Sequence, residues 1–102
     1  MKTGIELIAE ERQRQIDVEG WNAEHDDIGN NDEQLAEAAA LYALPEIRRC
    51  YEYDVMNLWP WDKKWWKPTP DDRVRELAKA GALIAAEIDR LQRIKQPLQT
   101  NK

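Results

Sequence analysis

Apolar residues recur at helical spacing in three stretches of the chain, and no stretch shows the strict polar–apolar alternation that is typical of a β-strand. The most regular pattern lies in residues 70–96, where apolar residues follow one another at alternating steps of three and four. Such steps place one continuous stripe on a helix face. The stripe comprises Val74, Leu77, Gly81, Ile84, Ile88 and Leu91. Gly81 within it predicts a tight crossing with another helix.

The ends of this helix carry recognisable signals. Thr69 is the expected N-cap, Pro70 suits the first helical position, and Pro97 is expected to end the helix. A second helix is predicted over residues 3–19, ending at Gly20. Its buried side is expected to carry Ile5, Leu7, Ile8 and Ile16.

The third helix is predicted over residues 32–44, with Asn30 or Asn31 as its N-cap. The preceding residues 20–31 are predicted to form a loop because Gly and Asn cluster there. After Pro45 a short helix is expected to restart at an angle. Residues 58–70 contain three prolines and four tryptophans, which excludes a regular helix.

These patterns predict an all-α fold: a small bundle of three main helices plus a short fourth, with a Pro/Trp-rich lid loop. Residues 1–96 are expected to form a single helical domain and residues 97–102 a flexible tail. The apolar share is 42%, the helix predicted over residues 32–44 is rich in alanine, and the apolar stripe in residues 70–96 is long. Such a bundle gains from burying more surface by association, so we expect at least a homodimer.

Composition removes several classes of protein. No run of about 18 apolar residues predicts a transmembrane helix, and no signal peptide is expected at residues 1–15. The chain has one cysteine, one histidine and no serine, which excludes an internal disulfide, a zinc site of thiolates and imidazoles, and a serine nucleophile. A lone cysteine fits the reducing cytoplasm. The net charge of −5 disfavours duplex DNA as a partner.

The most unusual segment combines aromatic and basic residues. Planar indoles stack on nucleobases while cations meet phosphates, so this pairing suits a nucleotide-like ligand. The candidate binding residues are Trp59, Trp61, Lys63, Lys64, Trp65, Trp66, Lys67, Arg48 and Arg73. Two other interpretations stay open: a structural lid over a small core, and a patch that docks on a host or phage protein.

Carboxylates form the second candidate site. Glu33 and Glu37 are four residues apart and share one helix face, and Glu76 lies on the last helix. Together they could hold Mg²⁺, which prefers oxygen ligands. His25 is the one group that titrates near neutrality without perturbation, which makes it the candidate general base. The alternatives are solvated helix faces for the glutamates and a turn-stabilising loop around His25.

The order ERQRQ, then GW, then spaced glutamates, then ELAKAGALIAAEIDRL resembles small phage-encoded relatives of the MazG-type all-α NTP pyrophosphohydrolases. The pattern EGW…EHDD…WPWD…WWKP is similar to a set of tailed-phage and prophage proteins, over nearly the whole chain. The first resemblance implies an ExxE and an ExxD pair that bind Mg²⁺. On this chain those frames fall on Gln34 and Glu37, and on Glu76 and Lys79.

Two of these four positions are not acidic, and a lysine repels the ion that an aspartate would hold. We therefore expect a phage-type protein that binds a nucleotide-like ligand without turnover and without a cofactor, and that sequesters a host defence signal. The alternatives are a Mg²⁺-dependent (d)NTP pyrophosphohydrolase, and an interaction module that uses the tryptophan patch.

Overall fold

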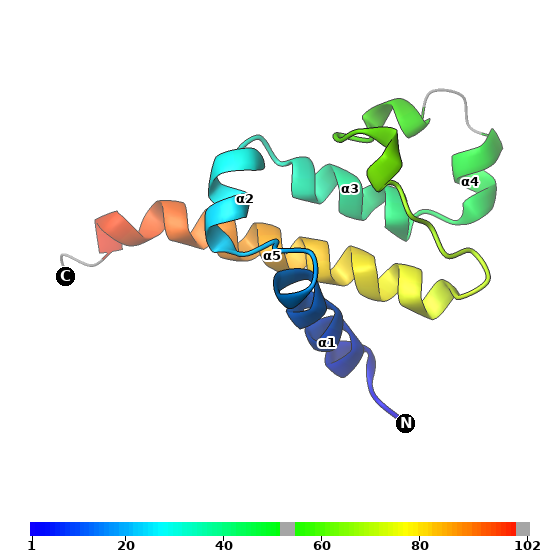
Figure 1. Cartoon of the computed structure of the whole chain (residues 1–102), viewed down its shortest axis with the longest axis horizontal. Helices are drawn as coiled ribbons and strands as arrows, with labels where there is room; N and C mark the ends of the chain where they lie inside the picture. Colours follow the sequence, from blue (N-terminus) through cyan, green and yellow to red (C-terminus); the bar gives the residue numbers. More distant parts are fainter. Residues whose placement is uncertain (52–54, 100–102) are drawn as a thin grey trace.

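The computed structural model describes residues 1–51 and 55–99. This described part contains helices and no β-strand, which confirms the all-α prediction (Figure 1). The α-helices are α1 (Gly4–Asp17), α2 (Ala23–Gly29), α3 (Gln34–Ala43), α4 (Glu46–Tyr51) and α5 (Arg73–Gln99). Two 3₁₀ helices, η1 (Val55–Leu58) and η2 (Lys63–Trp65), lie between α4 and α5. None of the described helices is long and apolar enough to cross a membrane.

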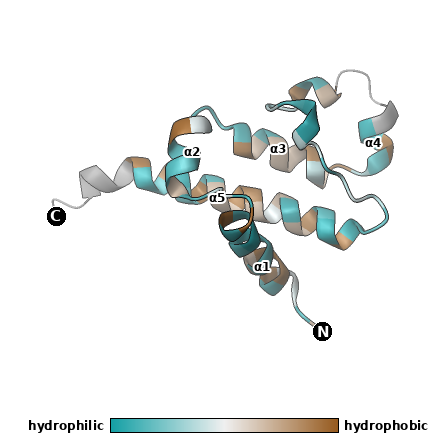
Figure 2. Ribbon diagram, viewed as in Figure 1, coloured by the Kyte–Doolittle hydropathy of each residue, from teal (hydrophilic) through white to brown (hydrophobic). Residues whose placement is uncertain are grey.

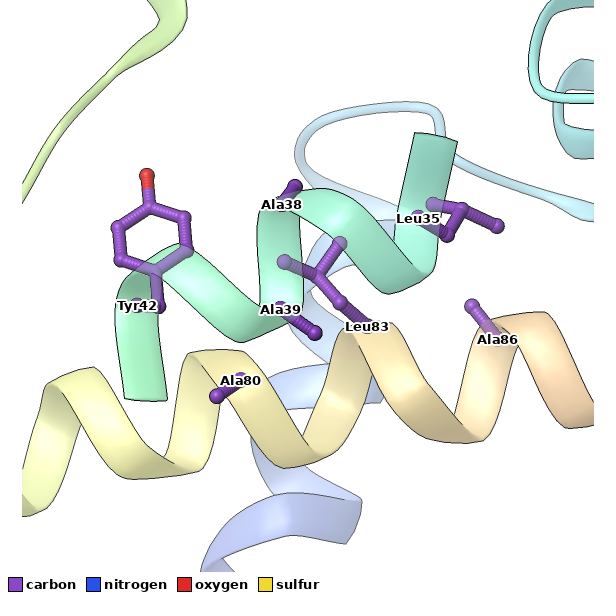
Figure 3. Packing of buried hydrophobic residues seen from close by; sticks show 7 residues of the cluster. All are labelled: Leu35, Ala38, Ala39, Tyr42, Ala80, Leu83 and Ala86. Atoms are coloured by element: carbon purple, nitrogen blue, oxygen red, sulfur yellow. The ribbon is translucent and has the colours of Figure 1, made fainter. Parts of the chain in front are cut away.

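The core forms where α3 and α5 run side by side in opposite directions (Figures 1 and 3). Alanine dominates this contact, so the two backbones approach closely. The buried cluster comprises Leu35, Ala38, Ala39 and Tyr42 from α3, and Ala80, Leu83 and Ala86 from α5. Trp21, Trp59, Trp61 and Trp66 pack against it from outside. A lid of tryptophans therefore covers a core that is itself short of large side chains.

Helix α1 crosses α5 at Gly81, as the sequence predicts. A Cβ atom built on Gly81 would lie 2.5 Å from Cδ1 of Ile8, so only glycine allows this approach. Thr3 begins α1 with a capping box, in which its Oγ1 accepts from the Glu6 N–H at 3.2 Å and its own N–H donates to Glu6 Oε1 at 2.8 Å.

The buried side of α1 differs from the prediction. Ile5 is 82% exposed, whereas Glu11 and Gln15 are buried. Leu7, Ile8 and Ile16 are half-buried. Glu11 can occupy this face because Arg14 donates two hydrogen bonds to its carboxylate, at 2.8 and 2.9 Å.

The predicted loop over residues 20–31 contains helix α2, so that prediction is wrong. Asn22 caps the helix by accepting from the His25 N–H at 2.9 Å. Asp26 is fully buried, and its carboxylate faces Arg12 of α1 at 3.4 Å. Because this ion pair joins α2 to a helix distant in sequence, local spacing alone does not reveal the short helix.

The predicted N-caps of the two later helices are also wrong. Glu33, in the left-handed conformation with φ 62°, precedes α3, and Asn30 is buried and bonded to Trp61 instead. Helix α5 begins at Arg73, and Asp72 rather than Thr69 accepts an N–H of the first turn, from Arg75 at 3.1 Å.

Helix α5 continues through Pro97 to Gln99, so Pro97 does not end it as expected. A proline this near the end removes only one helical hydrogen bond. Residues 100–102 of the predicted tail lie outside the described residues. The short helix predicted after Pro45 is present as α4 and η1, and residues 52–54 between them also lie outside the described part.

Candidate ligand-binding site

Two tryptophans of the 58–70 segment form the lid over Tyr42. The Trp66 ring stacks on Tyr42 with centroids 4.7 Å apart, and Trp59 meets both rings edge-on, at 5.7 Å from Tyr42 and 4.9 Å from Trp66. The Tyr42 hydroxyl accepts from the Lys67 N–H at 3.1 Å. Burial raises the pKa of Tyr42. Trp59 and Trp66 therefore match the structural-lid interpretation.

Trp61 extends this lid toward α2, and its ring meets that of Trp59 edge-on at 5.2 Å. Its Nε1 donates to Asn30 Oδ1 at 3.0 Å, and its ring lies 6.0 Å from that of Trp21. Asn30 is buried and donates from Nδ2 to Asp26 at 3.4 Å. A chain of polar contacts from α1 through α2 thus fixes the direction of the Trp61 ring.

A cavity of about 410 Å³ opens beside Trp61, within the volume range of small-molecule sites. Three indoles line it, together with a few polar side chains. The lining residues are Glu19, Trp21, His25, Gly29, Asn30, Leu35, Trp61, Asp62 and Trp65. Sequence reasoning proposed Trp61, Trp65 and His25 and missed Trp21, which lies about 40 positions away from the other indoles.

Trp65 forms the exposed edge of this cavity, with 47% of its surface accessible. The Lys64 and Lys67 amines lie 5.4 and 5.9 Å from its ring centroid. Asp62 begins η2 by accepting from the Lys64 N–H at 2.9 Å, which sets the turn that presents Trp65. Lys63 is exposed on the same 3₁₀ helix.

The polar groups of the cavity are mainly acceptors. Glu19 carries one ion pair, to Arg14 at 3.1 Å, and Asp62 is exposed. His25 lies with Nδ1 3.4 Å from the buried Asp26 carboxylate, so Asp26 is placed to orient the imidazole ring. Asp27 instead pairs with Arg93 of α5 at 2.8 Å.

Glu76, the third proposed metal ligand, is fully buried and engaged by cations. Its carboxylate accepts from Arg49 at 2.9 and 3.2 Å, from Arg73 at 3.0 Å and from the Thr69 N–H at 2.9 Å. Burial acts to raise the pKa of Glu76, but the hydrogen bonds from Arg73 and Arg49 outweigh it, so the pKa lies below its ordinary value.

The same two arginines close the carboxyl end of α3. Arg49 donates to the carbonyls of Leu41, Tyr42 and Leu44, at 3.2, 3.3 and 2.8 Å, and Arg73 donates to those of Tyr42 and Ala43. The structure therefore gives Arg73 a structural role and does not place it at the cavity. Arg48 is exposed on α4 and does not line the cavity.

The remaining carboxylates do not join Glu76. Glu37 is exposed on α3 and Glu33 is exposed in the left-handed conformation before it, so the two do not share a helix face as expected. Lys79, at the fourth position of the expected metal frames, is buried. Its amine donates to the Lys67 carbonyl at 2.7 Å, and burial lowers its pKa. Within residues 1–51 and 55–99, no group of three or more His, Cys, Asp or Glu side chains is placed to hold a metal ion.

Comparison of this chain with protein-family models, with curated proteins and with solved structures finds no match.

Proposed function

We propose that this protein binds a nucleotide-like ligand in the cavity between Trp21, Trp61 and Trp65, and that it does not turn the ligand over. The observation that carries the proposal is one cavity of about 410 Å³ lined by three indoles, with two lysine amines at the ring on its edge. Its volume suits a base with its sugar. The phosphates would extend past Trp65 toward Lys64 and Lys67.

The side chains that line the cavity support a nucleotide-like ligand. Indole faces stack on any planar base, and lysine amines attract phosphate oxygens. The carboxylates of Glu19 and Asp62 accept hydrogen bonds, so they favour a base that presents amino or ring N–H groups over one that presents only carbonyls. The ligand is thus expected to combine a donor-bearing ring with a phosphate.

The absence of turnover rests on the carboxylates. Glu76 is already neutralised by Arg49 and Arg73, whereas Glu33 is exposed before α3 and Glu37 is exposed on it. Retention without cleavage suits a phage-type protein that sequesters a nucleotide signal of host defence in the cytoplasm of the infected cell.

Calorimetry with the full chain tests this proposal. We expect binding heat in EDTA with at least one of ATP, GTP, ADP-ribose and a cyclic dinucleotide, and intact ligand afterwards by chromatography. Free ligand at about 1 mM half-fills a site with a binding free energy of about −4 kcal/mol. No heat from any of the four compounds at that concentration contradicts the proposal.

Variants locate the binding. Trp65→Leu should weaken affinity by about 5- to 150-fold, because one stacked base contributes about 1–3 kcal/mol. Lys64→Gln with Lys67→Gln should also weaken it, and more strongly at low salt. Lys63→Gln is the matched control, since it removes an exposed lysine of the same 3₁₀ helix. A loss in Lys63→Gln that is about half of the loss in the double variant, in free energy, would show that only overall charge matters.

The pyrophosphohydrolase alternative is tested in the same samples. If the protein were that enzyme, Mg²⁺ or Mn²⁺ would produce pyrophosphate from a (d)NTP, and Glu37→Gln would abolish the release. The interaction-module alternative relies on exposed indoles, and Trp65 is the most exposed of those in the 58–70 segment. A partner captured by wild-type protein and lost in Trp65→Leu, with no nucleotide heat, would favour that alternative.

A further inference from the structure

The apolar stripe of α5 lies on the outside of the described fold. Val74, Leu77, Ile84, Ile88 and Leu91 are between 41% and 61% exposed. They span 18 positions of one helix, which is roughly 26 Å at 1.5 Å per residue. Figure 2 shows hydrophobic positions recurring along this helix. The alternation of three and four steps is the a/d pattern of helices that pack against one another.

The opposite face of α5 has the reverse composition. It buries two acids and two bases: Glu76, Lys79, Glu87 and Arg90. Glu87 and Arg90 satisfy each other at 2.7 and 2.9 Å. Five of the nine buried hydrophobic residues of the described core are alanines. Apart from Leu83, the stripe thus leaves the large aliphatic side chains of α5 outside the core, although the burial of such side chains is the main source of stability.

The exposed area is larger than the average for a folded chain of this mass. A folded chain of 12.0 kDa exposes roughly 6000 Å² on average. This chain exposes 7187 Å², an excess of roughly 1200 Å² over that expectation. A standard protein interface takes about 800 Å² from each partner. The surplus is thus enough for one complete interface.

The residues beside the stripe fit a partner of the same kind. Ala80 is buried and Gly81 is covered by Ile8 of α1, so the face left open is the row of Leu77, Ile84, Ile88 and Leu91, and none of these residues is charged. A surface without charges does not select a different protein by electrostatic attraction. Two identical apolar stripes, in contrast, can pack against each other about a two-fold axis. Every copy of the chain has the same small apolar core. A second copy is the one partner that is present wherever the chain is made.

We propose that this protein forms a homodimer in which the exposed stripe of α5 packs against the same stripe of a second copy. The proposal is independent of the ligand site, because none of the stripe residues lines the cavity between Trp21, Trp61 and Trp65. Dimerisation and ligand binding can therefore fail separately.

Sedimentation of the full chain measures the mass directly, and we expect twice the 12.0 kDa of one chain. Ile84→Asp and Ile88→Asp should give monomers. Ile28→Asp and Ile47→Asp are matched controls, because they place the same charge at exposed isoleucines of α2 and α4 and should leave the dimer intact. Circular dichroism of every variant shows whether it is folded.

If the stripe variants fail to fold, the Tm of the wild-type protein still tests the proposal. The Tm of a dimer rises with protein concentration and that of a monomer does not. A wild-type monomer with a constant Tm would overturn the proposal. So would dimers of unchanged strength in Ile84→Asp and Ile88→Asp. A monomer that floats with vesicles of phosphatidylcholine and phosphatidylglycerol would overturn it too, and would assign the stripe to a membrane surface.

Discussion

Replacing Glu76 by glutamine separates a structural ion pair from a metal ligand. The carboxylate is fully buried and accepts from Arg49, Arg73 and the Thr69 N–H. Glutamine has nearly the same shape, but it loses the charge and turns an NH₂ group toward donors. The Arg49 side chain, which is 4% exposed, is then left buried without a counterion.

The cost of an uncompensated buried charge is about 3–5 kcal/mol. Domains of this size are stable by about 5–15 kcal/mol, so Glu76→Gln removes a large part of the total. At about 4–8 °C per kcal/mol, the Tm should fall by more than about 12 °C. Urea unfolding followed by tryptophan fluorescence at one fixed protein concentration measures the change. Glu37→Gln, at an exposed glutamate of α3, should cost less than about 1 kcal/mol.

The stability that the Glu76 carboxylate contributes decreases as the pH is lowered. Because the folded pKa of Glu76 lies below its ordinary value of 4.5, its contribution to stability is present above pH 4.5 and is lost as the pH falls below that value. The difference in the free energy of unfolding between wild type and Glu76→Gln should therefore become smaller as the pH is lowered from 7 to about 3.

The result that refutes this reasoning is a Glu76→Gln protein as stable as wild type, or more stable. That outcome is expected if Glu76 stands among other carboxylates and is held for a metal ion, because removing one of several like charges relieves repulsion.

Three further substitutions test the packing. Gly81→Ala should destabilise the protein by about 1–3 kcal/mol in thermal unfolding, because its Cβ would meet Ile8, and adding Ile8→Ala should restore part of the loss. Asn30→Leu should cost about 1–3 kcal/mol in urea unfolding, because it leaves the Trp61 N–H without its acceptor. Asp72→Ala should cost about 1 kcal/mol and fray the start of α5 in hydrogen exchange, because its carboxylate accepts the Arg75 N–H.

The fold class follows from the sequence because helical periodicity is a local property, and the crossing at Gly81 follows from one glycine within the stripe. The short α2 does not follow. Its seven residues are held by the buried Asp26 and by Arg12 of another helix, which no local pattern reveals. The predicted N-cap at Asn30 is wrong for the same reason, because Asn30 accepts a hydrogen bond from Trp61 and not from the start of α3.

The periodicity of α5 indicates an interface, but it does not say which face is turned inward. That choice depends on buried charges finding partners, such as Glu76 with Arg49 across 27 positions and Glu87 with Arg90 within one turn. A buried charged face contradicts the usual preference for apolar cores. It becomes acceptable only when every charge is paired or hydrogen-bonded, as Lys79 is to the Lys67 carbonyl, and tertiary structure alone determines that.

Residues 58–70 stand out in the sequence by their density of tryptophan and lysine, but the neighbours on which each indole packs could not be predicted. Trp59 and Trp66 pack on Tyr42, whereas Trp61 turns to Asn30 and Trp21. Trp21 could have been suspected, since it follows Gly20, whose φ of +77° marks a sharp turn after α1.

The most direct test of the ligand site is the indole N–H spectrum of ¹⁵N-labelled protein during nucleotide titration. The chain has five tryptophans, which give five separate signals. Binding in the cavity should shift the signals of Trp21, Trp61 and Trp65 most, and that of Trp66 least, because Trp66 is stacked on Tyr42 outside the cavity lining. Five unchanged signals with ATP, GTP, ADP-ribose and a cyclic dinucleotide, or the largest shift at Trp66, would contradict a ligand in this cavity.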